Sequence, residues 1–290
     1  LWVLDKTSTS MGSRLLKKWI EQPLNDIDDI NLRLDSVAEL KDKYIIRQEL
    51  MELLKSVYDI ERLVSKTVMA NANGKDLIAL KNSFYKLPHI KELSSKLQSR
   101  LCNELHNDID TFEDLCTLID KSINEDCPII LRDGNLIKTG FDEEVDKLRK
   151  ASHGGKSWII DFEEKEKERT GIKKLRVSYN KVFGYYIEIT NSFIDQVPND
   201  YIRKQTLVNS ERYITSELKK MEESILGAEE KLIRLEYEIF CRIRDTVAAS
   251  AEKLLKTAYS LYVTDVLCSL SEIADRYLYN RPNMVSACEI

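Results

Sequence analysis

The stretch that decides the fold is SELKKMEESILGAEEKLIRLEYEIF, residues 216–240. Its apolar residues are spaced alternately by three and four positions: Leu218, Met221, Ile225, Ala228, Leu232, Leu235 and Ile239. This is the a/d spacing of a helix that packs along its length against one partner helix. No proline occurs between Ser216 and Pro282, and Gly227 is the only glycine there. We therefore predict a long helix, and a helix of ~30 residues extends over ~45 Å.

The partner of this helix is predicted at residues 157–171. Helical character pauses at 152–155, Ser157 is a plausible N-cap, and residues 163–169 are all charged, which is typical of a solvated helical face. Between the two predicted helices the hydrophobic period changes from that of a helix to a simple alternation, at 175–179 and again at 185–189. We therefore expect a β-hairpin there and two further strands within 202–214.

The rest of the chain has the composition of a helical protein. Only 9 of 290 residues are glycine and 5 are proline, well below the averages of ~7% and ~5%. This excludes an all-β sandwich or barrel, which needs many turns. The predicted fold class is mainly α: a helical bundle with a long antiparallel two-helix arm that carries a small antiparallel β domain at its tip. The predicted domains are a core with the start of the arm (1–156), an ascending helix (157–171), the β domain (172–215), and a descending helix with the return to the core (216–290).

Charge is distributed unevenly between the β domain and the rest of the chain. Residues 170–215 contain seven basic and four acidic side chains, a net charge of +3 in a chain whose net charge is −5. A basic tip on an acidic body is typical of a module that touches a phosphate backbone. On charge alone, Lys173, Lys174 and Arg176 are candidate contacts. The alternatives are an ordinary charged surface, or a helical-arm scaffold that binds a protein partner without DNA contact.

No catalytic, metal or membrane signature is found. Gly154-Gly155-Lys156-Ser157 resembles a P-loop superficially, but the position that requires the first glycine is Lys150. A nucleotide-dependent enzyme built on Lys156 is therefore the weakest hypothesis. The six cysteines form no CxxC pair and there are only three histidines, so we expect neither a zinc site nor disulfides. No apolar run reaches the ~18 residues of a membrane span, and we expect a cytoplasmic protein.

Several strings resemble the MutS family of DNA mismatch repair proteins, in its bacterial form. They are TSMGSR at 9–14, ERTG at 168–171, YNKVFGYYIEI at 179–189 and RKQTLVNSERY at 203–213. The resemblance covers essentially the whole chain, and the strings in the β domain are highly specific. Two positions depart from the family pattern, because Ser10 and Ser216 stand where the family usually has proline.

The resemblance implies a function. MutS proteins are homodimers that encircle duplex DNA, find mismatches, use ATP and Mg to become sliding clamps, and signal to MutL. This chain would be the core, lever and clamp region, which binds the backbone of double-stranded DNA non-specifically and couples the clamp to an ATPase domain outside the chain. We expect no enzymatic activity, cofactor or mismatch specificity of its own, and a nucleoid-associated location. The DNA contacts carried over from the resemblance are Lys181, Arg203, Lys204, Asn209 and Arg212.

Overall fold

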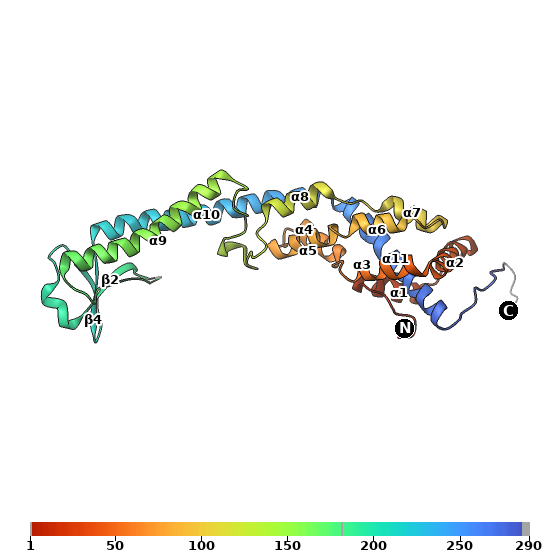
Figure 1. Cartoon of the computed structure of the whole chain (residues 1–290), viewed down its shortest axis with the longest axis horizontal. Coiled ribbons are helices and arrows are strands. Elements are labelled where there is room, and N and C mark those ends of the chain that lie inside the picture. The colour runs from red at the N-terminus through yellow and green to blue at the C-terminus, as the bar shows by residue number, and fades with distance from the viewer. Residues whose placement is uncertain (1, 181, 286–290) are drawn as a thin grey trace. The chain divides into compact units, whose positions relative to one another are not determined.

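The computed structural model describes residues 2–180 and 182–285, which form two compact units. Unit 1 comprises Leu1–Leu131 and Ile239–Ile290, and unit 2 comprises Arg132–Glu238. The described chain is mainly helical and contains one four-stranded antiparallel sheet (Figure 1), so the predicted fold class is confirmed.

Unit 1 is a bundle of helices around one central helix. Its helices are α1 (Ser10–Glu21), α2 (Ile27–Asp42), α3 (Tyr44–Leu54), α4 (Ile60–Val68), α5 (Gly74–Phe84), α6 (Leu87–Ser94), α7 (Arg100–Asp108), α8 (Glu113–Ser122), the end of α10 (Ser216–Ala249) and α11 (Ala251–Arg276). Helix α11 packs against α1, α2, α3, α4 and α7. A helix that is enclosed on most sides needs apolar or internally satisfied residues around its circumference. The hydroxyls of Thr264 and Ser271 accordingly donate to the carbonyl oxygens of Ser260 (2.8 Å) and Leu267 (2.7 Å), one turn earlier in α11.

A buried carboxylate on α11 holds the start of the chain. Asp265, which is fully buried, accepts hydrogen bonds from the backbone amides of Ser8 and Thr9, both at 2.8 Å, and from the Thr9 hydroxyl at 2.7 Å. Thr9 is also the N-cap of α1. A Cβ on Gly12 would lie 2.2 Å from the Asp265 carboxylate oxygen Oδ2, so only glycine leaves room for this contact.

The two departures from the family pattern fall at equivalent helix positions. Ser10 follows the N-cap Thr9 of α1, and Ser216 is the first residue of α10, where the hydroxyl of the preceding Thr215 accepts from the Leu218 amide. Proline is favoured at this first helical position because its missing N–H has no partner there. Serine also allows a helix to begin at this position, because α1 starts at Ser10 and α10 starts at Ser216.

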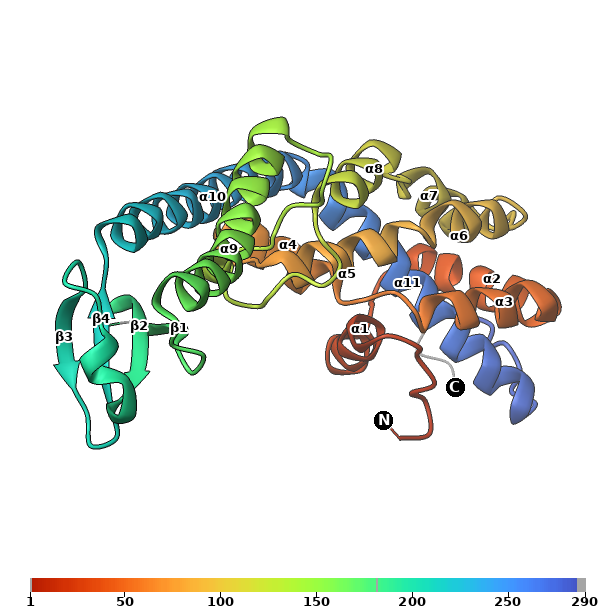
Figure 2. The same ribbon diagram turned by 60° about the vertical axis from the view of Figure 1, so that its left-hand side comes forward.

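Unit 2 contains the sheet and the two helices that flank it. Its elements are α9 (Glu143–Thr170), β1 (Arg176–Asn180), β2 (Gly184–Thr190), η2 (Asn191–Gln196), β3 (Ile202–Thr206), β4 (Ser210–Ile214) and the first part of α10. The short helix η1 (Leu131–Asp133) lies at the boundary, because unit 2 begins at Arg132. The strand order is β1-β2-β4-β3, and each neighbouring pair is antiparallel (Figure 2). The register pairs Val177 with Ile187 and Ile187 with Tyr213, and a bulge interrupts β3 between Arg203 and Gln205.

The sequence-based start of the ascending helix is wrong. Helix α9 begins at Glu143, where Asp142 accepts hydrogen bonds from the amides of Glu144 and Val145, and it continues without a break to Thr170. Ser157 therefore lies within the helix and is not its N-cap. A glycine costs a helix about 1 kcal/mol, and the cap and the contacts with α10 offset that cost. The helix ends at Gly171, whose φ is 73°.

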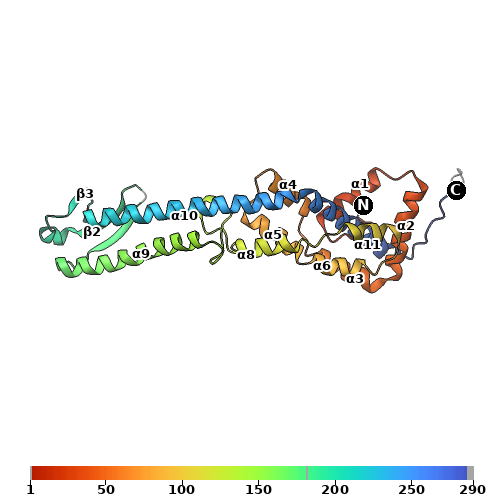
Figure 3. The same ribbon diagram turned by 90° about the horizontal axis from the view of Figure 1, so that it is seen from above.

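Helix α9 and the first part of α10 run antiparallel, side by side (Figure 3). Arg149 pairs with Glu236 at 2.6 Å, the Ser152 hydroxyl donates to Glu229 at 3.2 Å, and Lys165 lies 3.9 Å from Glu217. Position numbers thus rise along α9 as they fall along α10. Along the predicted seam, Leu218 and Ile225 are buried, whereas Met221, Ala228, Leu232 and Leu235 are half-buried. A single partner helix covers only part of this row of apolar side chains, so the others remain half-buried.

Candidate nucleic-acid interface

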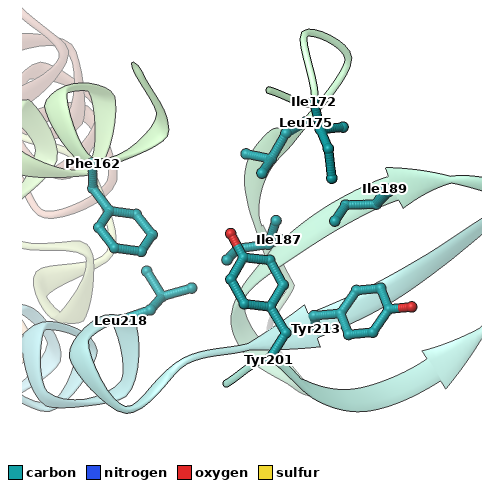
Figure 4. Close-up of a cluster of buried hydrophobic side chains, with 8 residues drawn as sticks. All are labelled: Phe162, Ile172, Leu175, Ile187, Ile189, Tyr201, Tyr213 and Leu218. Atoms are coloured by element: carbon teal, nitrogen blue, oxygen red, sulfur yellow. The ribbon is translucent and has the colours of Figure 1, made fainter. Parts of the chain in front are cut away.

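One face of the sheet is occupied by a hydrophobic core. Phe162 of α9 and Leu218 of α10 point toward side chains of the sheet and its loops (Figure 4). The cluster consists of Phe162, Ile172, Leu175, Ile187, Ile189, Tyr201, Tyr213 and Leu218, and none is more than 7% exposed. This face is therefore closed to a macromolecular partner, which leaves the opposite face and the two ends of the sheet.

The strand register places the candidate residues at different ends of the sheet. Arg176 in β1 lies opposite Glu188 in β2, and Thr190 at the end of β2 lies opposite Ser210 in β4. We call the end formed by residues 173–176, 190–191 and 206–210 the distal end. Helix α10 starts directly after β4, at the other end, so that Lys173, Lys174, Arg176 and Asn209 share the distal end.

An open cleft of about 510 Å³ lies at the distal end. Its lining residues are Lys167, Lys173, Lys174, Leu175, Arg176, Glu188 and Thr190. Lys173, Lys174 and Arg176 are exposed, and no described residue forms an ion pair with them. Four cations against one carboxylate make this cleft positive, and such a cleft attracts phosphate groups.

A carboxylate on α9 neutralises part of the charge of the cleft. Glu163 accepts hydrogen bonds from Lys167 and, at 2.8 Å, from the backbone amide of Val177. Burial raises the pKa of Glu163, but these two hydrogen bonds together with the charges of Lys167 and Arg176 lower it by more, so the net pKa is below its ordinary value. Glu163 therefore stays ionised, and Lys167 contributes less to the positive field than Lys173 or Lys174 does.

Asn209 sits in a tightly bonded turn. The Asn191 amide donates to the Asn209 carbonyl oxygen at 3.1 Å, the Asn191 side chain donates to the Val208 carbonyl oxygen at 3.0 Å, and the Leu207 amide donates to the Ser210 carbonyl oxygen at 2.8 Å. The Asn209 side chain is exposed at the tip. An amide presented in this way can donate to a phosphate oxygen without ordering cost in the backbone.

Two of the predicted contacts, Arg203 and Arg212, form ion pairs within the sheet. Arg212 is 19% exposed at its side chain and donates to Glu188 (3.3 Å) and Gln205 (3.0 Å), while its guanidinium lies 4.3 Å from the centre of the Tyr186 ring. Arg203 pairs with Glu211 at 3.3 Å. Arg212 thus joins three strands on the outer face, and a phosphate would have to compete with Glu188 for it.

Lys204 lies away from the distal end. It occupies the bulge of β3 and lines a cleft of about 200 Å³ with Phe183, Tyr185 and Lys219, among other residues. Lys181 lies outside the described residues. The structure therefore brings Lys173, Lys174 and Arg176 to one cleft, with Asn209 in the neighbouring turn. Arg212 lies at the edge of this cleft, because Arg176 and Arg212 are both opposite Glu188 in the register, whereas Arg203 and Lys204 lie elsewhere on the sheet.

The interpretation of residues 163–169 as a solvated helical face is wrong on one side of the helix, where Glu163 and Lys167 are half-buried and Glu166 is buried. Glu166 is only 4% exposed, accepts from the Tyr201 hydroxyl at 2.6 Å and pairs with Arg169 at 2.7 Å. Burial, and then the hydrogen bond to Glu166, raise the pKa of Tyr201. Arg169 also pairs with Asp200 at 3.1 Å, so this network ties the end of α9 to the β3 side of the sheet. The sequence does hold a signal for Glu166, because it follows the buried Phe162 by four residues and so lies on the same face of α9.

Three further observations concern nucleotide binding, metal binding and membrane insertion. Residues 154–157 lie inside α9 rather than in a loop between a strand and a helix, where a P-loop occurs. Among residues 2–180 and 182–285, no group of three His, Cys, Asp or Glu side chains could hold a metal ion. No described helix is both long enough and apolar enough to cross a bilayer.

Comparison with known proteins gives consistent matches. The sequence profile of the family described as MutS domain III matches residues 1–271. The chain is 55% identical over 284 residues to the DNA mismatch repair protein MutS of Acetivibrio thermocellus and 56% identical over 284 residues to that of Caldicellulosiruptor bescii; each alignment covers 98% of this chain and 33% of the relative. It is 51% identical to MutS of Clostridium botulinum, over all of this chain and 31% of the relative. The chain thus spans about a third of the length of these relatives.

Proposed function

The chain belongs to the MutS family of DNA mismatch repair proteins, and on that basis we propose that unit 2 binds the backbone of double-stranded DNA without reading its sequence. The observation that carries this proposal is the distal end of the sheet, where Lys173, Lys174 and Arg176 lie beside an open cleft and close to Asn209 in the register. Contacts from such side chains to phosphate oxygens position a protein on DNA but specify no base.

The remaining functions belong to the whole protein and are proposed by analogy with the relatives. We propose that the complete polypeptide is a homodimer, binds ATP and Mg in a domain outside this chain, and acts with MutL in the cytoplasm at the nucleoid. In this scheme α9 and α10 form the lever that couples the clamp to the ATPase. The Arg149–Glu236 ion pair and the Arg169–Glu166–Tyr201 network support a coupling role, because they tie both ends of α9 to neighbouring elements. The chain itself is proposed to have no ATPase activity.

The test is fluorescence anisotropy with a labelled homoduplex and a matched mismatched duplex, at several salt concentrations. We expect equal affinities in the non-specific range, with Kd of ~10⁻⁴–10⁻⁶ M, that fall steeply as salt rises. The double variant Lys173→Glu with Lys174→Glu should weaken binding of both duplexes equally and make the salt dependence shallower.

The matched control is Lys220→Glu with Lys231→Glu, which changes the net charge by the same amount at exposed positions of α10. It should bind as the unaltered chain does, apart from a small general effect of charge. If both double variants bind equally well, the distal end is not the contact surface. A clear preference for the mismatched duplex would refute non-specific binding.

A further inference from the structure

Unit 1 has an apolar groove that no part of the described chain fills. Its volume is about 360 Å³, which lies within the ~300–1,000 Å³ of typical binding clefts. Helices α1 and α2 form most of it, and its walls include Leu16, Trp19, Ile20, Leu24, Leu34 and Leu270. Ile20 is 47% exposed. Apolar surface of this kind, with a large aromatic side chain at its edge, is typical of an interaction site.

An arginine at the edge of the groove has no partner for its charge. The Arg33 guanidinium lies 3.4 Å from the centre of the Trp19 ring, and no described residue forms a hydrogen bond or ion pair with it. Burial lowers the pKa of Arg33, while the nearby Tyr259 and Asp29 act in the opposite direction without forming an ion pair. A half-buried guanidinium held flat on an indole keeps its N–H groups available for a bidentate carboxylate.

We propose that this groove docks an apolar segment that carries one Asp or Glu, whose carboxylate pairs with Arg33, and that this segment belongs to the part of the full-length polypeptide outside this chain. The charge of Arg33 selects an acidic partner, and the groove selects an apolar one. Trp and Arg together are the side chains most often found at the energetic centre of an interface. The relatives are about three times as long as this chain, and a segment in the same polypeptide has an effective concentration of the order of mM.

The test is hydroxyl-radical footprinting with mass spectrometry, which measures the oxidation rate of Trp19 in the full-length protein and in this chain alone. We expect the rate in the full-length protein to be lower by at least about fivefold, as for a groove that is occupied more than about 80% of the time. The protection should not depend on protein concentration. Trp2, which is 84% exposed, provides an internal reference outside the groove walls.

Two substitutions test the carboxylate. Because Arg33 itself shields Trp19, each variant is judged by the ratio of the rates in the full-length protein and the isolated chain. Arg33→Glu should bring that ratio close to one. Arg242→Glu, an exposed arginine for which no ion pair is found in the described chain, should leave the ratio unchanged.

Three results would overturn the proposal. Equal Trp19 oxidation in the unaltered full-length protein and the isolated chain would show that nothing from the rest of the polypeptide covers the groove. Protection that appears only as protein concentration rises would assign the groove to a second copy. Protection that survives Arg33→Glu would show that the occupant is not recognised through a carboxylate.

Discussion

Replacing Gly12 by alanine is expected to destabilise unit 1 far more than the size of a methyl group suggests. The added Cβ would lie 2.2 Å from Asp265 Oδ2 and 2.9 Å from its Cγ. Overpacking of this kind costs about 1–3 kcal/mol, and a displaced Asp265 weakens hydrogen bonds to a charged group worth about 1.5–3 kcal/mol each. We therefore expect a loss of about 3 kcal/mol. For a unit of this size, about 2–4 °C per kcal/mol gives a fall in Tm of about 6–12 °C.

The assay is thermal unfolding followed by circular dichroism at 222 nm. The control is Gly227→Ala, since Gly227 also lies within a helix but an added Cβ there meets no atom within 4 Å. Alanine is a better helix former than glycine by about 1 kcal/mol, so the control should be neutral or slightly stabilising. If Gly12→Ala unfolds within about 1 °C of the unaltered chain, the Asp265 contact does not constrain this position and the reasoning is refuted.

Three further predictions concern unit 2. Arg149→Ala leaves the buried Glu236 without its main partner and should cost about 2–3 kcal/mol in a urea titration, whereas replacing both residues by leucine should recover most of that loss. Asn209→Ala should weaken duplex binding severalfold in the anisotropy assay with no change in Tm, because the turn is held by backbone groups and Asn191. The pKa of Glu163 is lowered in the folded protein, so its ionised carboxylate stabilises the fold above the ordinary pKa of about 4.5, and this stabilisation is lost as pH falls through the lowered pKa. The free energies of unfolding of Glu163→Gln and of the unaltered chain should therefore differ at pH 7 and become equal in acid. Urea titrations across this pH range measure the difference.

The elements that sequence predicts well are those whose signal is local. The three-four spacing from Leu218 onward predicted α10, and the alternation around Val177 and Ile187 predicted the first hairpin, because each pattern reflects neighbours within one element. The start of α9 has a local signal in its N-cap Asp142, but the continuity of the helix through residues 154 and 155 depends on more distant groups. Glycines at 154 and 155 suggested a break, but Arg149 is bound to Glu236, which lies on another helix and cannot be identified from the sequence around residue 150.

For the candidate site, too, the sequence shows which charged side chains are present but not which of them form ion pairs. Composition identified a basic β domain correctly, and the sequence names its basic side chains, but only the register shows which of them are paired. Arg212 lies opposite Glu188 on the neighbouring strand, and the side chain of Arg203 reaches along the sheet to pair with Glu211. The sequence places Glu188 far from Arg212, so its role as a partner becomes visible only when β2 and β4 are aligned.

Ion pairing therefore reduces the number of β-domain cations that are available to a phosphate. The acidic side chains Glu188 and Glu211 bind arginines on the sheet, and Asp200 binds Arg169 of α9. Lys173 and Lys174 have no such partner among the described residues, and their short loop precedes β1 at the distal end. A phosphate that binds Lys173 or Lys174 meets a cation that is in no ion pair with a described residue, whereas one that binds Arg212 at the edge of the same cleft must displace Glu188. Because of this difference in desolvation and competition, we propose that the distal lysines, rather than the arginines that the sequence strings single out, are the main phosphate contacts.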